Sequence, residues 1–479
     1  MDKMDFLIWF GCYLVLLTIF GLWVSSRKKQ TGEDFLLAGR NLGPLLLVGT
    51  VVATCIGTGS TMGAVGTAYE KGFLGATYGL ATGLGILATG WLFSDSRKYR
   101  FVTLAEEVAF YYGANPHIKA VIGVMVFLAS VGYLGGHIVG GGMYLAWASG
   151  LDLMYAKIII AFGFALFTVF GGYIAVVWTD TIMAVVLLTG FCIVAWVAVQ
   201  MVGGLQPLEE AAGGKLFHFG IDGMGWGEFL AIMVPSSISI LAVPSFRQRI
   251  YSGSGVGIVR ASFYFSGVAI ILFSLLPATI GVAASILTPG LEKSNFAFPQ
   301  MAAHVLAPGL GILILISGLS ATISSASSDA MTGTSILVSD VYRLFMGRAP
   351  QEGRVVMISR LSLIITTIVA ILFTLYADDI LSYLIKMLST ITTGMAVCIL
   401  MGKFWPRATW QGGIAAIIGG ATTSLAFINI AALKAISAHP GVPALAMALI
   451  CGVVVSFMTK RNEVSKEKAL EILNAERSV

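Results

Sequence analysis

The chain has 479 residues, of which 57% are hydrophobic and 11% are charged, against about 25% charged in an average soluble domain. Its 29 Lys and Arg and 24 Asp and Glu residues are too few to give a soluble protein of this size a polar surface. With a mean hydropathy of +0.89, the composition excludes a water-soluble enzyme, a disordered chain and a fibrous repeat. The net charge of +5 is spread over loops and gives no support to nucleic-acid binding.

The apolar residues are grouped into segments long enough to cross a bilayer, which needs about 20 residues of helix. We count thirteen such segments and therefore predict an all-α polytopic membrane protein. The stretch from 153 to 201 is too long for one span, and the pair Gly171–Gly172 marks a turn between two helices. The thirteen segments are 5–25, 42–69, 73–94, 120–148, 153–172, 176–201, 226–249, 260–286, 309–342, 356–377, 380–402, 411–433 and 442–459.

The positions of the basic residues predict how the chain is threaded. With the N-terminus outside, 22 of the 29 Lys and Arg residues, including Arg247 and Arg249 at the end of the seventh span, fall on the cytoplasmic side and 6 fall outside. The remaining one, Lys386, lies inside a span, where it can snorkel toward the outer surface. Because cytoplasmic loops carry the excess of positive charge, this bias favours thirteen spans with the N-terminus outside and the C-terminus inside.

Two segments outside the spans have mixed charged and apolar faces, namely Thr103–Tyr112 and the tail Glu463–Arg477. In the first segment Glu106 and Glu107 are adjacent acidic residues. We interpret them as the solvated face of a short helix and not as a catalytic pair.

Two predicted spans carry signals of a broken helix. In lipid every backbone polar group must be satisfied internally, so broken helices occur only around protein-lined cavities. Matched breaks in two halves of a chain point to a transporter binding site, whereas the alternative is small residues that let helices pack closely. The signals are Gly57, Gly59, Gly63 and Gly66 in the second span, and Pro235 and Pro244 around Ser236, Ser237 and Ser239 in the seventh.

Ionisable and hydroxyl side chains inside the spans are further functional candidates, because buried polar groups in a membrane are costly. Asp180 lies early in the sixth span, and Asp329 follows a row of serines in the ninth. Na⁺ is a hard cation that takes oxygen ligands, which hydroxyls, backbone carbonyls and one carboxylate can supply. The alternative is a packing face with hydrogen bonds between helices. The row has helical spacing and comprises Ala321, Ser324, Ser325 and Ser328, with Ser327 at its border.

Five motifs follow one another along the chain. They are GEDFLLAGRNLG (Gly32–Gly43), ATCIGTGSTMG (Ala53–Gly63), GGYIAVVWTDTIMA (Gly171–Ala184), PSFRQRIYS (Pro244–Ser252) and ATISSASSDAMTGTSILVSDVY (Ala321–Tyr342). In this order, and with thirteen spans, the chain resembles the sodium:solute symporter family over essentially its whole length. The resemblance implies a LeuT-type fold in one transporter domain, 1–479. In that fold an extra helix (5–25) precedes two inverted five-helix repeats (42–201 and 226–402), followed by two helices (411–459) and a cytoplasmic tail (460–479).

The resemblance also implies sodium ligands. The site common to the family would use the backbone carbonyls of Ala53, Ile56 and Ala321 and the hydroxyls of Ser324 and Ser325. Some members have a second sodium site, whose positions here are Asp180, Ser327 and Ser328. For Asp180, proton transfer and a purely structural role remain alternatives. Asp329 matches neither site and keeps no assigned role, and neither does Lys386. We interpret His137 as a hydrogen-bonded interior histidine.

For the solute, the broken spans predict a pocket near mid-membrane. Members that carry sugar use a Gln and a Glu where this chain has Ser60 and Gly79, and an aromatic pair where it has Ser239 and Ile240. A small amino acid, an organic acid or a similar compact solute therefore fits better than a hexose. The residues expected to bind it are Thr54, Cys55, Gly57, Thr58, Ser60, Ser236 and Ser239.

The sequence thus predicts a symporter that imports a small solute together with Na⁺ by alternating access, with no other cofactor. It would act in the plasma membrane, which in a bacterium is the inner membrane. The nearest alternative is an H⁺-coupled symporter or a uniporter of the same fold. A polytopic membrane enzyme is less well supported, because no HExxH motif, catalytic carboxylate pair or histidine cluster is present.

Overall fold

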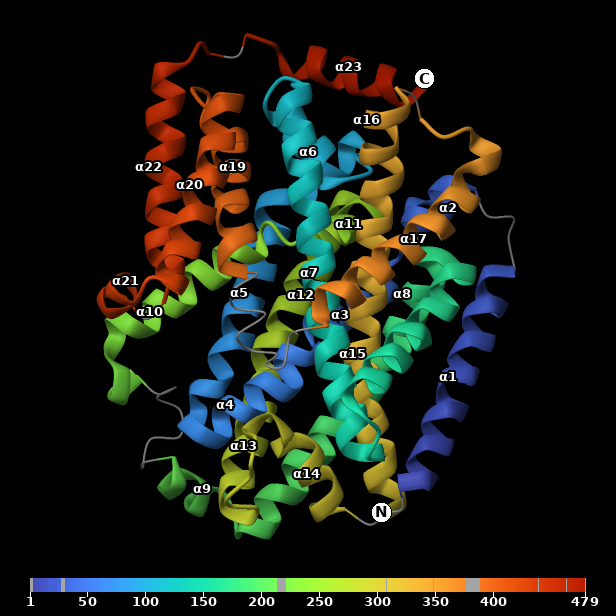
Figure 1. Cartoon of the computed structure of the whole chain (residues 1–479), viewed down its shortest axis with the longest axis vertical. Helices are drawn as coiled ribbons and strands as arrows, with labels where there is room; N and C mark the ends of the chain where they lie inside the picture. Colours follow the sequence, from blue (N-terminus) through green and yellow to red (C-terminus); the bar gives the residue numbers. More distant parts are fainter. Residues whose placement is uncertain are drawn as a thin grey trace.

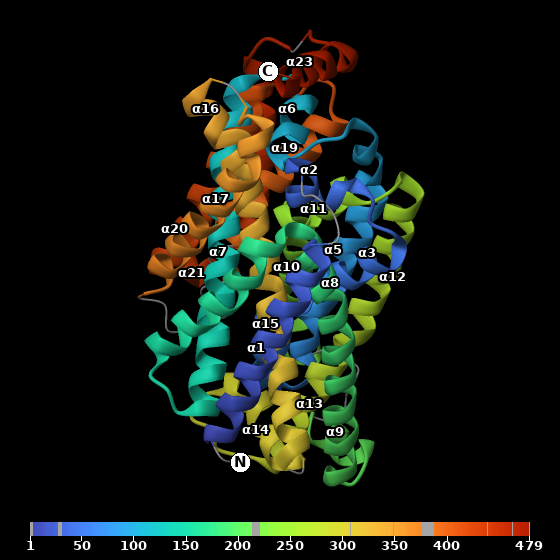
Figure 2. The same ribbon diagram turned by 90° about the vertical axis from the view of Figure 1, so that its right-hand side faces the viewer.

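A computed structural model describes residues 3–26, 31–212, 221–306, 308–347, 349–375, 388–437, 439–461 and 463–478. These ranges are helical, and their only β-type pairing is one isolated bridge between Leu42 and Gly253. Helices run along the long axis of the molecule, and the two chain ends lie at its opposite ends (Figures 1 and 2). Lys386 falls outside the described residues.

Within the described ranges, nine helical segments are long and apolar enough to cross a membrane, or ten if the bent pair Gly225–Ile240 and Pro244–Ser252 counts as one span. The predicted membrane class is therefore confirmed. The helices of these segments are α1 (Lys3–Ser26), α5 (Thr77–Phe93), α7 (Pro116–Ser149), α8 (Leu153–Val202), α12 (Val256–Phe273), α13 (Leu275–Leu287), α15 (Pro308–Ile336), α17 (Glu352–Thr374), α20 (Trp410–Asn429) and α22 (Gly441–Met458).

The remaining helices extend, link or cover these segments. Two of them, α3 and α19, are short and apolar, and α23 lies across the end of the molecule that carries the C-terminus (Figure 1). The remaining helices are α2 (Gly32–Leu37), α3 (Pro44–Cys55), α4 (Ala64–Lys71), α6 (Leu104–Tyr111), α9 (Leu205–Ala211), α10 (Ile221–Ile240), α11 (Pro244–Ser252), α14 (Ala297–Val305), α16 (Tyr342–Met346), α19 (Thr393–Phe404), α21 (Ala431–Ile436) and α23 (Lys466–Ser478).

Helix α8 is 50 residues long and turns where the sequence predicts. Gly172 interrupts its helical backbone with φ 64° and ψ −165°, a conformation that only glycine adopts without strain. A Cβ atom at Gly172 would also lie 2.8 Å from the ring of Phe35. The predicted division of residues 153–201 into two helices is confirmed.

The break in the second span is also confirmed. Helix α3 ends at Cys55, and Ile56 leaves the helical conformation with φ −93° and ψ 67°. The chain resumes as a wider π-helical turn, η2 (Gly59–Gly63), before α4 begins. The freed carbonyl of Gly57 accepts the amide N–H groups of Ser60 and Thr61, both at 3.1 Å. The glycines thus allow a turn in which some backbone oxygens point away from the helix axis.

The break in the seventh span lies between α10 and α11, whose axes differ by 44°. Pro244 occupies the first position of α11, where its missing N–H costs nothing. The carbonyl of Leu241 at the break accepts two hydrogen bonds from Arg247, at 3.1 and 2.9 Å. Every residue of α11 is buried, so this short helix is part of the protein interior.

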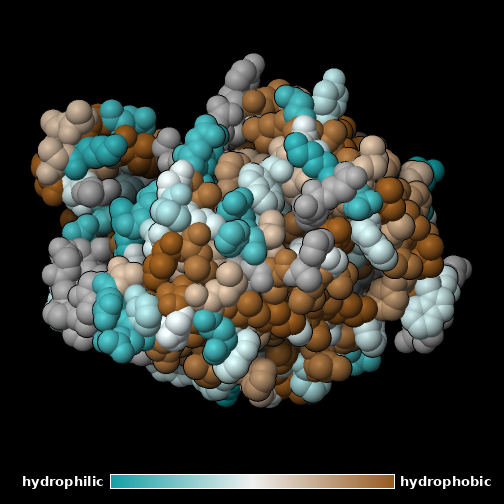
Figure 3. All heavy atoms as spheres, turned by 90° about the horizontal axis from the view of Figure 1, so that it is seen from below, coloured by the Kyte–Doolittle hydropathy of each residue, from teal (hydrophilic) through white to brown (hydrophobic). Residues whose placement is uncertain are grey.

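Large apolar side chains cover the flanks of the bundle. They are exposed on several helices, as expected for a surface that faces lipid. Seen from the end at which α1 begins, hydrophobic atoms extend over much of the surface, with hydrophilic side chains between them (Figure 3). Examples on the flanks are Trp9 and Leu16 of α1, Phe162 of α8, Phe265 of α12, Leu361 of α17 and Ile418 of α20.

The interpretation of Glu106 and Glu107 as a solvated helix face is wrong, because α6 is buried on both sides. Glu107 is 0% exposed and accepts hydrogen bonds from Ser96 at 2.7 Å and Tyr111 at 2.6 Å. Arg247 of α11 lies 3.2 Å from its carboxylate. Distant segments cover α6, which its own sequence does not reveal.

Glu106 is buried by the tail of the chain. Arg477 of α23 donates to its carboxylate at 2.6 Å, and the backbone N–H of Val102 donates at 2.7 Å. The predicted amphipathic character of the tail is confirmed, since Ala469 and Leu473 are fully buried while the neighbouring charged residues are exposed.

We expect Glu107→Ala to destabilise the protein by about 3–5 kcal/mol, because it leaves the Arg247 guanidinium buried without its counter-charge. The measurement is thermal unfolding of the purified protein. Glu463→Ala, at an exposed position, is the matched control and should change stability by less than about 0.5 kcal/mol. Equal stability of both variants would contradict a buried ion pair.

Candidate sodium and solute sites

Three elements meet where the second span is broken. The end of α3 packs against α15 and against the second half of α8, so residues far apart in sequence share one region of the interior. The hydroxyl row of α15 faces this region because residues three and four apart lie on one side of a helix. All of the sodium-ligand positions predicted from the sequence are fully or almost fully buried.

Four of the five members of the first predicted ligand set lie together. The hydroxyl of Ser324 donates to the carbonyl of Ala53 at 3.2 Å and to that of Ala321 at 3.0 Å. The hydroxyl of Ser325 lies 3.3 Å from the carbonyl of Ala53. The fifth, Ile56, is the C-cap residue of α3, and its N–H donates to the carbonyl of Val52 at 3.0 Å. The four grouped residues offer neutral oxygens, without a charged side chain among them, that suit a hard monovalent cation.

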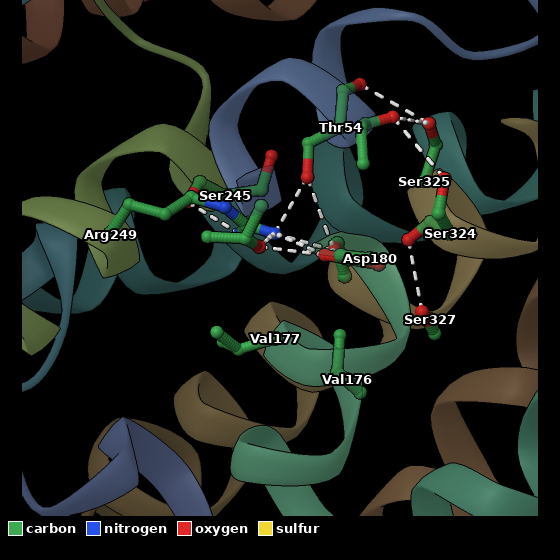
Figure 4. Close-up of polar contacts among 12 residues, drawn as sticks. Thr54, Val176, Val177, Asp180, Ser245, Arg249, Ser324, Ser325 and Ser327 are labelled. Carbon is green, nitrogen blue, oxygen red and sulfur yellow. Dashed lines mark hydrogen bonds and ion pairs between the residues drawn. The ribbon is translucent and has the colours of Figure 1, made fainter. Parts of the chain in front are cut away.

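The second predicted set is only partly brought together. Asp180 is 0% exposed, and one of its oxygens, Oδ2, accepts hydrogen bonds from Thr50 at 2.7 Å and Ser328 at 3.1 Å. Ser327 instead donates to the carbonyl of Ser324 at 2.9 Å, which ties it to the first set (Figure 4). The two sets therefore adjoin each other along α15.

Sequence reasoning gave no role in the site to Arg249. We placed it on the cytoplasmic side, at the end of the predicted span 226–249, but it is 0% exposed and reaches toward Thr54 and Asp180 from the side opposite Ser324 and Ser325 (Figure 4). Its Nη2 atom lies 2.6 Å from the hydroxyl of Thr54, 2.5 Å from that of Ser328 and 3.4 Å from Asp180 Oδ2. The break before α11 turns this arginine inward.

One carboxylate oxygen of Asp180 accepts no hydrogen bond from the described residues. Its Oδ1 atom is buried and has no hydrogen-bond partner among the described residues, and neither has the hydroxyl of Ser245 nearby. A buried carboxylate oxygen without a donor is costly. The arrangement can therefore accept a cation at Oδ1, with Arg249 holding Oδ2 in the way that hydrogen-bond partners orient ligating carboxylates.

A cavity of about 290 Å³ opens beside the broken spans. Of the residues predicted to bind solute, Thr54, Cys55, Gly57, Ser236 and Ser239 line it. Because these come from α3, the break after it, and α10, the two broken spans do face one cavity. It also reaches Tyr78 of α5, Phe246 of α11 and Thr393 of α19.

Thr58 and Ser60 do not line the cavity; they support residues that do. Ser60 donates to the carbonyl of Cys55 at 2.9 Å. Thr58 lies 3.2 Å from Nδ1 of His137 and 3.1 Å from Thr322. The side chains of Thr58 and Ser60 thus lie behind the cavity wall, which the glycine pattern alone does not reveal.

Sequence reasoning gave no role to Asp329 and interpreted His137 as a hydrogen-bonded interior histidine, but it did not pair the two in the cavity wall. Nε2 of His137 on α7 lies 3.4 Å from Oδ2 of Asp329 on α15, and both residues line the cavity. The position of Asp329, directly after the serine row, was the available signal. What the sequence does not contain is the partner, because α7 and α15 are far apart along the chain.

A family model settles the relationship of the chain to known proteins. The model that describes the sodium:solute symporter family matches residues 35–420. The chain belongs to the sodium:solute symporter family. It is a Na⁺-coupled symporter and not an enzyme, as the sequence predicts.

Individual transporters are similar to this chain along nearly their whole length. The osmoregulated proline transporter OpuE of Bacillus subtilis is 25% identical, over 96% of this chain and 96% of its own. The sodium/pantothenate symporter of Escherichia coli is 26% identical, over 92% of this chain and 94% of its own.

Solved transporter structures share the fold. A Na⁺-coupled sialic acid symporter in a substrate-bound outward-open state superposes with a TM-score of 0.82 at 18% identity, over 95% of this chain and 97% of its own. The closed form of Mhp1, a nucleobase-cation-symport-1 family transporter, gives 0.61 at 15% identity, over 91% of this chain and 98% of its own. This symporter therefore has the all-helical architecture of that transporter group.

Proposed function

We propose that the symporter imports a compact solute through the cavity beside the two broken spans, driven by Na⁺ bound at the first ligand set. The observation that carries the proposal is that the first ligand set and the cavity share one stretch of backbone. Ala53 of α3 contributes to the ligand set, and Thr54, the next residue, lines the cavity. An ion that orders this turn also orders the solute site. Na⁺ thereby favours the state that binds solute, which is what coupling requires.

The ligands of the first ion are the carbonyls of Ala53, Ile56 and Ala321 and the hydroxyls of Ser324 and Ser325. We further propose a second ion at Oδ1 of Asp180. The unpartnered oxygen supports it, as does the hydroxyl of Ser328, 3.1 Å from the same carboxylate. Ser327, which the resemblance assigns to this ion, donates to the carbonyl of Ser324 and adjoins both ions.

The solute is a small amino acid or another compact molecule, with proline as the first candidate. The cavity of about 290 Å³ is of the size that suits a compact ligand. The proline transporter OpuE is among the relatives, whereas the positions that bind sugar in sugar-carrying members are Ser60, Gly79, Ser239 and Ile240 in this chain. The expected contacts are Thr54, Cys55, Gly57, Ser236 and Ser239, with Thr58 and Ser60 behind them.

We propose thirteen spans, with the N-terminus outside and the C-terminus in the cytoplasm of a cell whose plasma membrane holds the protein. A helix of 50 residues is about 75 Å long, so α8 must cross twice. The opposite positions of the chain ends support an odd number of crossings (Figures 1 and 2). The matched breaks support inverted repeats at 42–201 and 226–402, after the helix at 5–25 and before 411–459 and the tail at 460–479.

Uptake into proteoliposomes tests this function. With the membrane potential held at zero, a tenfold inward Na⁺ gradient supports accumulation of labelled L-proline up to about tenfold for one coupled ion and about 100-fold for two. We expect the higher limit, no uptake with K⁺ in place of Na⁺, and no uptake of glucose. Accumulation that follows a pH gradient and persists without Na⁺ would establish proton coupling instead.

A further inference from the structure

The wall of the solute cavity contains a buried carboxyl group that neither predicted sodium site uses. Asp329 is 4% exposed and is the only carboxylate among the described residues that line the cavity. Its position on α15 follows Ser328, but its side chain lines the cavity while Ser328 contacts Asp180. A charge in such a place requires a partner of opposite sign or several donors.

His137 supplies one donor to Asp329. The hydroxyl of Thr58 can donate to Nδ1 of the imidazole, in which case the ring is neutral and carries its proton on Nε2, toward Asp329. Thr322 can in turn donate to the oxygen of Thr58, so this neutral arrangement satisfies every group in the chain of hydrogen bonds. His137 thus orients the carboxylate, and at 3.4 Å the contact is long.

None of the cationic side chains at or near the cavity contacts Asp329 in the part of the chain that the structure describes. Arg249 contacts Asp180, Thr54 and Ser328. Lys71 lines the cavity but is exposed to solvent, and His439 lies 3.3 Å from Glu228. The carboxyl group of Asp329 is therefore available to whatever enters the cavity.

We propose that Asp329 binds a cationic amino group of the transported solute, which makes the substrate class a compact amine, amino acids included, and excludes sugars and simple organic anions. This inference rests on the proposed function, because it assigns a chemical class to the solute of that cavity. The aromatic rings of Tyr78, Tyr133 and Phe246 line the same cavity and suit a cation, whose charge their faces attract.

The same geometry links the amine site to sodium. A Cβ atom at Gly57 would lie 2.6 Å from the ring of His137 and 2.6 Å from the hydroxyl of Ser325. This glycine thus separates the residue that orients Asp329 from a ligand of the first ion. A shift of the turn on Na⁺ binding is therefore expected to reach both His137 and Ser325. We expect the amine to bind more tightly when Na⁺ is present.

Thermal unfolding of the purified full chain, in Na⁺ or in K⁺, tests the proposal. The probes are L-proline, L-serine and 4-aminobutyrate at about 10 mM, each beside its N-acetyl derivative, which has the carboxylate but no charged amine. We expect at least one amine to stabilise the protein in Na⁺ and its N-acetyl derivative to have no effect. Asp329→Asn should weaken the effective amine at least about tenfold while Na⁺ alone still stabilises the variant.

The same measurements distinguish failure of the amine proposal from failure of the proposed sodium site. Equal stabilisation by an amine and its N-acetyl derivative overturns the proposal, as does stabilisation by Na⁺ without an effect of any amine. If Asp329→Asn does not fold, the comparison of probes on the wild-type protein still decides. A wild-type protein that Na⁺ itself does not stabilise would instead contradict the proposed sodium site, for which Ser325→Ala is the reference variant.

Discussion

Replacing Ser324 or Ser325 with alanine is expected to raise the Na⁺ concentration for half-maximal solute uptake by about 5- to 150-fold. The two hydroxyls lie 3.2 and 3.3 Å from the carbonyl of Ala53, so each is placed to contribute one oxygen to the same ion. Loss of one buried polar partner costs about 1–3 kcal/mol, which corresponds to that range. The measurement is uptake into proteoliposomes over a series of Na⁺ concentrations.

The matched control lies on the same helix. The hydroxyl of Ser317 is as buried as those of Ser324 and Ser325 but donates only within α15, to the carbonyl of Ile314 at 2.7 Å. Ser317→Ala should therefore leave the Na⁺ dependence unchanged. An unchanged Na⁺ dependence in Ser324→Ala and Ser325→Ala would remove the hydroxyl row from the ion site and leave helix packing as its role.

For Asp180→Asn we expect the loss of one bound Na⁺ per protein and a destabilisation of about 3–5 kcal/mol. Both effects follow from the position of the carboxylate, whose Oδ1 is free for an ion while Oδ2 neutralises Arg249 at 3.4 Å. An amide can still accept hydrogen bonds but carries no charge, so the guanidinium is left uncompensated. Counting bound ²²Na⁺ and measuring thermal unfolding on the same preparation gives the two quantities separately.

The double variant Asp180→Asn/Arg249→Gln distinguishes an ion ligand from a structural ion pair. It removes both charges, so stability should recover in part while the second Na⁺ remains absent. If Asp180→Asn binds as many ions as the wild type, the guanidinium of Arg249 is the cation that Asp180 binds, and no second Na⁺ binds there. The symporter would then couple one ion.

Local sequence determined the membrane class, the breaks and the helix face that carries the serine row. The length of the apolar segments gives the membrane class, Gly172 permits a backbone conformation that other residues avoid, and Pro244 starts a new helix. The spacing of Ser324 and Ser325 puts them on one face of α15 wherever that helix lies. Each of these depends on a residue and its near neighbours, which is why the sequence alone was sufficient.

Only the tertiary structure decided which charges are buried and with what. Arg249 and Glu107 belong to segments that, by composition, resemble solvated loops, yet each is fully buried beside a partner from a remote segment. Asp180 lies 69 residues before Arg249, and Glu107 lies 140 residues before Arg247. The pairing of His137 with Asp329 is of the same kind. A charged side chain is stable inside a protein only when a distant segment supplies its counter-charge or donors, and that depends on packing that no local pattern encodes.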